Sequence, residues 1–151
     1  MKYDPYDIEI GLTSMTFEFV SEGPKGAIIK RVEYSATAKP DIFILSFGDV
    51  DAKTGEINDE IISNNSDSIK VLSTVASSVY LFTESYPNAI VYAEGNNAAR
   101  TRLYRMSISN NLKELNEEFY VSGFIENVGW HTFEKNKDYS SFSVKRKKIL
   151  K

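Results

Sequence analysis

A chain of 151 residues with 42% hydrophobic and 26% charged residues is long enough for one packed core, and its composition is that of a single globular domain over residues 1–151. It has no cysteine and one histidine, His131, which excludes disulfides, thiolate metal sites, cysteine nucleophiles and multi-histidine metal centres. No apolar run approaches the roughly 18 residues that a membrane helix needs, so we expect a cytoplasmic protein with no membrane partner.

The net charge of −3 is divided unevenly along the chain. Residues 1–94 hold 7 Lys/Arg against 15 Asp/Glu, whereas residues 95–151, with a basic tail from about 145 to 151, hold 11 against 6. The basic half could meet an acidic partner such as nucleic acid, or the two halves could pair within the fold. The second interpretation is favoured, because dedicated nucleic-acid domains are usually basic overall.

The first third of the chain predicts three strands. In "MTFEFV" the alternation places Met15, Phe17 and Phe19 on one face, which is the period of a half-buried strand. Turn residues at 21–26 and a second alternating run, "AIIKRVEYSA", complete a hairpin. The nearly continuous apolar run at 42–48, "IFILSFG", predicts a central strand that is covered on both faces.

A long helix is predicted after the polar loop at 49–65. Apolar residues recur there at three- and four-residue spacing: Ile69, Leu72, Val75, Ala76, Val79 and Phe82. Ser66 or Asp67 can cap the start of this helix. It must end by Tyr86, because Pro87 disfavours helical geometry in the residue before it.

The remaining elements alternate in type. A short buried strand at 89–94 precedes a second helix at about 98–108, in which Ala99, Leu103 and Met106 share one stripe that we expect to face the core. "SNN" interrupts or recaps that helix, and strands at 119–125 and 139–147 close the chain around an aromatic loop. The order β-β-β-α-β-α-β-β predicts an α+β fold: a largely antiparallel sheet with two helices packed on one face. Only the first helix could join two parallel strands.

One junction between a strand and a helix stands out as a candidate site. Gly95, Asn96 and Asn97 form a turn at the end of a strand, where glycine allows close approach and free N–H groups at a helix start favour an anion. The asparagine at 97 can cap the helix. The turn matches neither a Walker motif nor a dinucleotide fingerprint.

Three arginines follow this turn within six residues. Arg100 and Arg102 could reach an anion round the first helical turn, whereas Arg105 lies beside Arg102 towards one flank, with Arg100 towards the other. The alternative is that these arginines form structural ion pairs. The acidic residues available for such pairs are Asp49, Asp51, Asp67 and Glu94.

A second cluster opens the first helix. Asn65 and Asp67 could orient a polar ligand or accept a hydrogen bond from an arginine of the second helix, although ordinary helix capping accounts for the same residues. Asp49 and Asp51 have the spacing of metal ligands. Lys53 and Thr54 stand where a calcium loop needs an oxygen ligand and glycine, so no metal site is predicted.

Four segments, taken in order, carry a resemblance: "LSFGD", "NNSDSIKVLSTVA", "GNNAARTRLYR" and "YSSFSVKRK". Over residues 26–147 the chain resembles a family of small uncharacterised bacterial proteins, a domain of unknown function with an ARTRLYR-like segment. The resemblance implies a bacterial, cytosolic, single-domain protein and carries over no catalytic residue.

Three functional hypotheses follow, and no cofactor is predicted for the first two. The first is a non-enzymatic binding domain that recognises nucleic acid or another phosphate- or carboxylate-bearing ligand through residues 95–105, with the basic tail extending the surface. The second is a protein-interaction module, such as a homodimer or a toxin–antitoxin or defence component, that uses a strand edge or the aromatic loop. The third is a metal-dependent hydrolase that uses Asp49, Asp51 and Asp67.

Overall fold

A computed structural model describes residues 3–58 and 63–148 and shows a mixed α+β fold. The elements of these residues, in chain order, are β1 (Glu9–Ile10), β2 (Thr16–Gly23), β3 (Gly26–Ala36), β4 (Ile42–Val50), β5 (Ile57–Asn58), α1 (Ser68–Ser85), β6 (Ile90–Ala93), α2 (Ala98–Asn110), α3 (Leu112–Glu118), β7 (Phe119–Ile125), β8 (Gly129–Thr132) and β9 (Ser141–Arg146). Part of the predicted loop at 49–65 and the end of the predicted tail lie outside the described residues.

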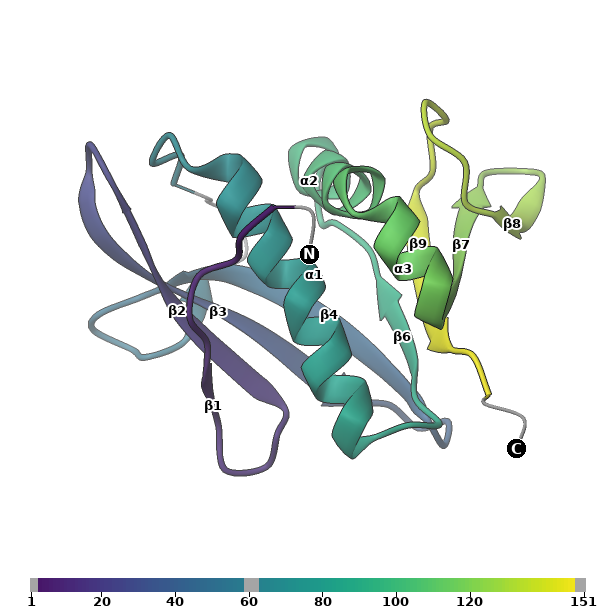
Figure 1. The fold of residues 1–151 in the computed structure, drawn as a ribbon, viewed down its shortest axis with the longest axis horizontal. Coiled ribbons are helices and arrows are strands. Elements are labelled where there is room, and N and C mark those ends of the chain that lie inside the picture. The colour runs from purple at the N-terminus through teal and green to yellow at the C-terminus, as the bar shows by residue number, and fades with distance from the viewer. Residues whose placement is uncertain (1–2, 59–62, 149–151) are drawn as a thin grey trace.

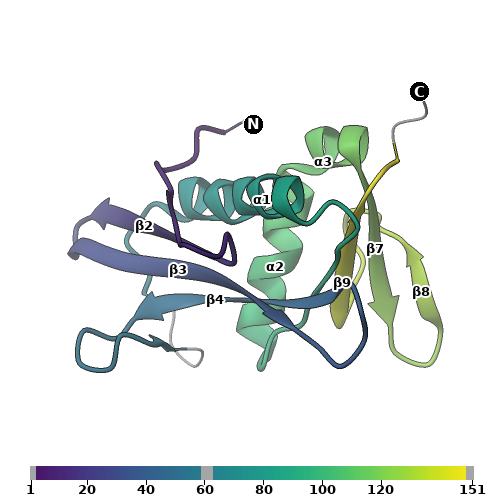
Figure 2. The ribbon, with the colours of Figure 1, turned by 90° about the horizontal axis from the view of Figure 1, so that it is seen from below.

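The strands form one sheet in the order β1-β2-β3-β4-β6-β9-β7-β8, and β5 pairs with β4. Every pairing is antiparallel except that of β4 with β6, the two strands that α1 joins. In Figure 1, α1 crosses the sheet diagonally and α2 is seen nearly end-on. Figure 2 shows that α1 lies over β2, β3 and β4. The predicted antiparallel sheet and its single parallel crossover are therefore confirmed.

The number of elements differs from the prediction. There are three helices in the described chain instead of two, because Asn111 ends α2 and at once begins α3. Strands β1 and β5 have two residues each, too few to show any alternation in sequence. Strand β8 replaces part of the predicted aromatic loop and lies at the edge of the sheet beside β7.

The predicted hairpin of β2 and β3 is confirmed. Its strands pair from Thr16–Glu33 to Gly23–Gly26, and Gly26 takes a positive φ of 86° that favours glycine at this turn. Phe17 and Val32 are fully buried, as the alternation indicates. The inner face of β3 also includes a lysine, Lys30, which is 1% exposed.

Strand β4 is central, as predicted, but it is covered on one face only. Phe43, Leu45 and Phe47 point into the core, whereas Ile44 between them is 41% exposed. The helices lie over the face that carries these aromatic rings. The prediction that both faces of this strand are covered is therefore wrong. An unbroken apolar run does not require such cover, since apolar residues are common on protein surfaces.

Helix α1 has the predicted extent and the predicted core face. It ends at Ser85 with Tyr86 as its C-cap, and Phe82 is fully buried against the rings of Tyr34 and Phe43. Ile69, in the first turn of the helix, is an exception to the predicted core face, because it is 52% exposed. No described helix has the length and apolarity that crossing a membrane requires.

Candidate functional site

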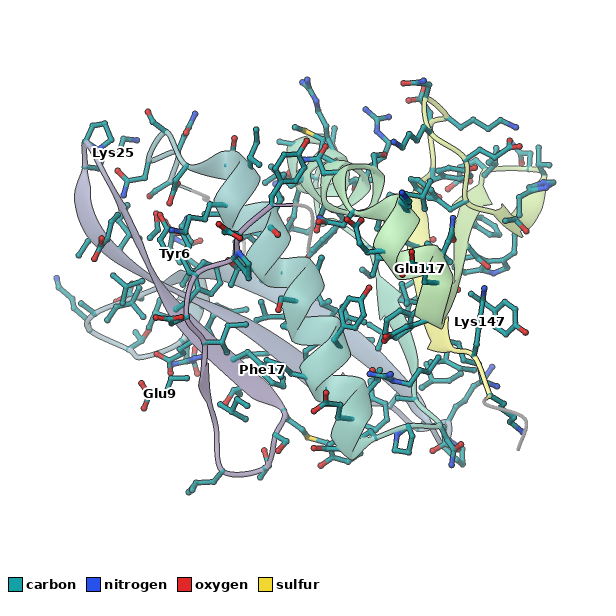
Figure 3. The ribbon with its side chains drawn as sticks, viewed as in Figure 1. Tyr6, Glu9, Phe17, Lys25, Glu117 and Lys147 are labelled. Carbon is teal, nitrogen blue, oxygen red and sulfur yellow. The ribbon has the colours of Figure 1, made fainter. Side chains whose placement is uncertain are left out.

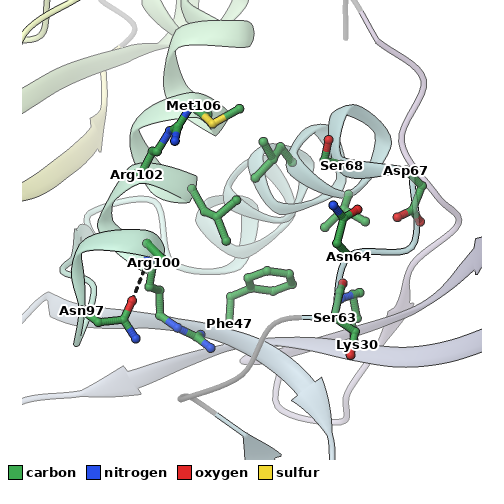
Figure 4. Close-up of a pocket in the computed structure, with 14 residues that line it drawn as sticks. Lys30, Phe47, Ser63, Asn64, Asp67, Ser68, Asn97, Arg100, Arg102 and Met106 are labelled. Atoms are coloured by element: carbon green, nitrogen blue, oxygen red, sulfur yellow. Dashed lines mark hydrogen bonds between the residues drawn. The ribbon is translucent and has the colours of Figure 1, made fainter. Parts of the chain in front are cut away.

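A cavity of about 680 Å³ opens between the start of α1, one side of α2 and the strands β3 and β4 (Figure 4). We call it the α1–α2 cavity. Its apolar lining residues are Phe47, Val71, Leu72, Ala99, Leu103 and Met106. Its polar lining residues are Lys30, Ser63, Asn64, Asp67, Ser68, Asn97, Arg100 and Arg102.

The prediction that the apolar stripe of α2 faces the core is wrong. The stripe faces the α1–α2 cavity instead. Ala99 is exposed, and Leu103 and Met106 are only half-buried. The residues of α2 that are buried are Arg100, Tyr104, Ser107 and Ile108. The helix is therefore rotated so that a charged residue is buried and an apolar stripe remains open to solvent, the reverse of an ordinary amphipathic helix.

The turn before α2 is shaped by backbone packing. A Cβ atom at Gly95 would overlap the backbone nitrogen and hydroxyl of Thr101, so only glycine fits there. Asn97 caps α2 as predicted, because its side chain accepts a hydrogen bond of 2.8 Å from the Arg100 backbone. Asn96 is exposed in the turn and does not line the cavity.

Arg100 is the most unusual residue of the site. It is 4% exposed, and its Nη2 donates a single hydrogen bond of 3.2 Å to the backbone oxygen of Asn58. Its Nε has no hydrogen-bond partner among the described residues. No carboxylate of the described chain lies within ion-pair distance of the guanidinium. A buried charge with so few partners is costly, which is why buried cations are normally paired.

The other two arginines of α2 differ from Arg100 and from each other. Arg102 is exposed, lines the α1–α2 cavity and makes no ion pair with any described residue. Arg105 donates through Nη1 to Asp138 at 2.7 Å. Arg102 and Arg105 also line a second hollow of about 420 Å³ on the flank of α2. The predicted separation of Arg100 from Arg105 is thus present, and Arg102 stands between them.

Lys30, which lines the cavity, is part of a largely buried ion pair that sequence reasoning missed. Lys30 donates to Asp49 at 2.6 Å and to the Ser63 backbone oxygen at 3.1 Å. Although burial opposes it, hydrogen bonding from Lys30 and Ser63 lowers the pKa of Asp49 below its ordinary value. Lys30 alternates in phase with Val32 and Tyr34, which is the signal that could have placed it on the inner face.

Asp67 occupies the N-cap position of α1 but makes no capping hydrogen bond. Its Oδ2 instead accepts hydrogen bonds of 2.6 Å from the hydroxyls of Tyr6 and Ser21. Burial and the bond to Asp67 raise the pKa of Tyr6. No lysine or arginine in the described ranges lies within ion-pair distance of Asp67, which lines the cavity opposite α2 (Figure 4).

Asn65, expected beside Asp67 as a ligand contact, lies behind the cavity wall. It is 1% exposed, and its Oδ1 accepts from the Lys25 backbone at 2.7 Å. Its Nδ2 donates to the Gly26 backbone oxygen at 2.8 Å. These bonds hold the start of α1 against the hairpin of β2 and β3, so Asn65 supports the site without lining it.

The carboxylates of the hydrolase hypothesis serve three separate local functions. Asp49 pairs with Lys30, Asp67 accepts from two hydroxyls, and Asp51 accepts from the backbone of its own turn at Lys53. In the described parts of the chain, no group of three or more His, Cys, Asp or Glu side chains could hold a metal ion. This arrangement gives the hydrolase hypothesis no support.

The described part of the basic tail, residues 145–148, lies at the other end of the sheet from the arginines of α2. Lys145 pairs with Ile90 at the start of β6, whereas the turn to α2 follows the far end of β6. Figure 3 places Lys147 well away from α2. Arg146 is used inside the fold, because it donates to the Thr83 hydroxyl and the Tyr80 backbone. The described residues therefore form no continuous basic surface from the tail to Arg100.

Other candidate residues lie apart from the cavity. His131 is exposed on the edge strand β8, next to Trp130, which is 47% exposed. Ile44 and Trp130 leave apolar surface on the helix-free face of the sheet. The interaction-module hypothesis stays a prediction.

The comparisons identify a family but no function. The chain belongs to a family of unknown function, DUF6934, whose model matches residues 2–147. Neither the curated proteins nor the solved structures gave a significant match. The expected membership of an uncharacterised family is confirmed, whereas the bacterial source and the role of the arginine segment stay predictions.

Proposed function

We propose that this member of the family of unknown function is a non-enzymatic binding protein, which takes a small anionic ligand with an apolar body into the α1–α2 cavity. The observation that carries the proposal is Arg100. Its side chain is almost fully buried at the cavity, and among the described residues it has one carbonyl as its hydrogen-bond partner and no carboxylate beside it. A carboxylate or phosphate would supply the missing negative charge.

Two further features support an anion at this place. Arg102 reaches the same cavity and has no described ion-pair partner, so it is free to bind a ligand. The cavity also lies at the start of α2, where the helix dipole favours negative charge. Asn97 already caps one N–H group, so the two guanidinium groups contribute more than the backbone.

The apolar lining supports a compact ligand with a hydrophobic part. Leu103 and Met106 remain partly exposed on α2, and Val71 and Leu72 face them from α1. Ligand pockets typically combine such apolar walls with a few polar groups in about 300–1,000 Å³. A nucleic-acid backbone would need a long basic surface instead, and the position of Lys145, at the end of β6 far from α2, argues against one.

Nuclear magnetic resonance titration tests the proposal with a simple probe, 4-phenylbutyrate, and its neutral amide. We expect saturable shifts of amide signals around the cavity with the acid and little change with the amide, because only the acid can pair with the arginines. Arg102→Gln should weaken binding of the acid about tenfold, the loss of one charged hydrogen bond. A 3-phenylpropylphosphonate probe then compares phosphonate with carboxylate.

The matched control is Arg105→Gln, which removes the same charge from the same helix outside the α1–α2 cavity. It should leave binding of the acid unchanged. Equal binding of acid and amide, or equal weakening by the two variants, would refute the proposal. Binding of labelled DNA and RNA, measured across a salt series, tests whether the ligand is a nucleic acid instead of a small anion. Binding that falls steeply with salt and weakens in Arg102→Gln would favour nucleic acid.

A further inference from the structure

On its two sides, the α1–α2 cavity has charges of opposite sign that form no ion pair with any described residue. Arg100 and Arg102 stand on the α2 side, and Asp67 stands at the start of α1 (Figure 4). The third cation of the lining, Lys30, is already paired with Asp49. The charges that remain for a ligand are thus positive on one wall and negative on the other.

Among the described residues, only neutral groups hold Asp67 in place. The hydroxyls of Tyr6 and Ser21 both donate to its Oδ2 at 2.6 Å, which fixes the carboxylate without neutralising its charge. Its Oδ1 has no hydrogen bond to another described residue. A side chain anchored in this way can accept a hydrogen bond from a ligand without moving first, which lowers the entropy cost of binding.

Polar groups beside Asp67 extend this end of the cavity. Asn64 and Ser68 line the wall next to it, and both are exposed. Figure 4 shows the ring of Phe47 between Arg100 and this end of the cavity, and Leu72 and Leu103 add to the apolar lining. From the start of α1 to α2, the cavity therefore presents a negative charge, an apolar surface and positive charges. A complementary ligand has a cationic group, an apolar body and an anionic group in that order.

We infer, on the basis of the proposed function, that the ligand is a zwitterion: a short apolar peptide with free ends, whose carboxylate meets Arg100 and Arg102 and whose ammonium group meets Asp67. An ammonium group has three donors and suits a carboxylate flanked by amide and hydroxyl oxygens. Apolar side chains of the peptide would cover the stripe of α2 that remains half-exposed.

The test is calorimetric titration with three forms of one dipeptide: leucyl-phenylalanine, its N-acetyl derivative and its C-terminal amide. We expect the free dipeptide to bind about tenfold more tightly than either blocked form, since each block removes one charge-assisted contact. Asp67→Asn keeps an acceptor for Tyr6 and Ser21. It should weaken the free dipeptide about tenfold and leave the N-acetyl form unchanged.

Asp138→Asn is the control, because it removes a fully exposed carboxylate that pairs with Arg105 outside the α1–α2 cavity. If the free and N-acetyl forms bind equally and Asp67→Asn has no effect, the zwitterion is overturned while the anion site stands. If no dipeptide binds but 4-phenylbutyrate does, the peptide class is wrong. If neither the dipeptides nor 4-phenylbutyrate bind, both proposals fail.

Discussion

The contribution of the Lys30–Asp49 pair to the free energy of unfolding can be predicted quantitatively. The change to test is Asp49→Asn, which keeps the size of the side chain. It also keeps an acceptor for the Ser63 backbone N–H, which donates to Asp49 at 3.0 Å. It removes the only carboxylate that pairs with Lys30 in the described chain. Lys30 is 1% exposed, so its charge would be left in the interior without a counter-ion.

Breaking a buried ion pair by removing one partner costs about 3–5 kcal/mol. Two observations place this case below that range. The Asp49 side chain is 15% exposed, and Lys30 keeps its hydrogen bond of 3.1 Å to the Ser63 oxygen. We therefore expect Asp49→Asn to lower the free energy of unfolding by about 2–3 kcal/mol. At about 2–4 °C per kcal/mol for a domain of this size, Tm should fall by about 4–12 °C.

The effect should depend on pH. The folded-state pKa of Asp49 lies below its ordinary value of 3.8, so the pair stabilises the protein above that value and the stabilisation is lost as the pH falls through the folded-state pKa. The difference between wild type and Asp49→Asn should be largest at neutral pH and shrink below pH 3.8.

The assay is urea unfolding of wild type and Asp49→Asn at neutral pH and at several acidic values. Asp51→Asn is the control, because Asp51 is exposed in a turn and makes no described ion pair. We expect its stability to be close to that of wild type at every pH. A variant Asp49→Asn as stable as wild type at neutral pH, or a difference that does not shrink in acid, would refute the reasoning.

Three other variants separate structural from ligand-binding roles. Gly95→Ala should unfold about 2–3 kcal/mol more easily in urea because its Cβ overlaps Thr101; unchanged stability would contradict the packing described for this turn. Asn65→Ala removes a buried side chain and leaves the part-buried backbone N–H of Lys25 and carbonyl of Gly26 without this partner, and we expect a loss of about 2 kcal/mol in the same assay; a loss below about 0.5 kcal/mol, the range of ordinary surface changes, would be inconsistent with its role. Arg105→Gln should not change Tm measurably, since Asp138 is fully exposed, and a clear fall in Tm would show that the pair is structural.

Much of the fold follows from patterns in the sequence. The hairpin of β2 and β3, the extent of α1 and the strand β7 match the predicted elements, because each has enough residues to show its period. Strands β1 and β5, with two residues each, are too short to show a period. Helix α3 is separated from α2 only by Asn111. The sequence indicated an interruption at this place but did not predict a separate third helix.

The site was predicted less well, for a physical reason. Periodicity shows which residues share a face of a helix, but not which face meets the core. The stripe of Leu103 and Met106 was assigned to the core, although Arg100 and Tyr104 take that place. Similarly, Lys30 and Asp49 are opposite one another only through the register of β3 and β4, which a single sequence does not give.

The central claim is that Arg100 binds an anion in the α1–α2 cavity, and the resonance of its own side chain tests this most directly. The Nε–H signal of Arg100, identified by its loss in Arg100→Lys, should be observable because the group is buried. We predict that 4-phenylbutyrate shifts this signal in a saturable way and that the neutral amide does not. A signal of Arg100 that stays unchanged, while the signals of other cavity residues saturate, would contradict the claim.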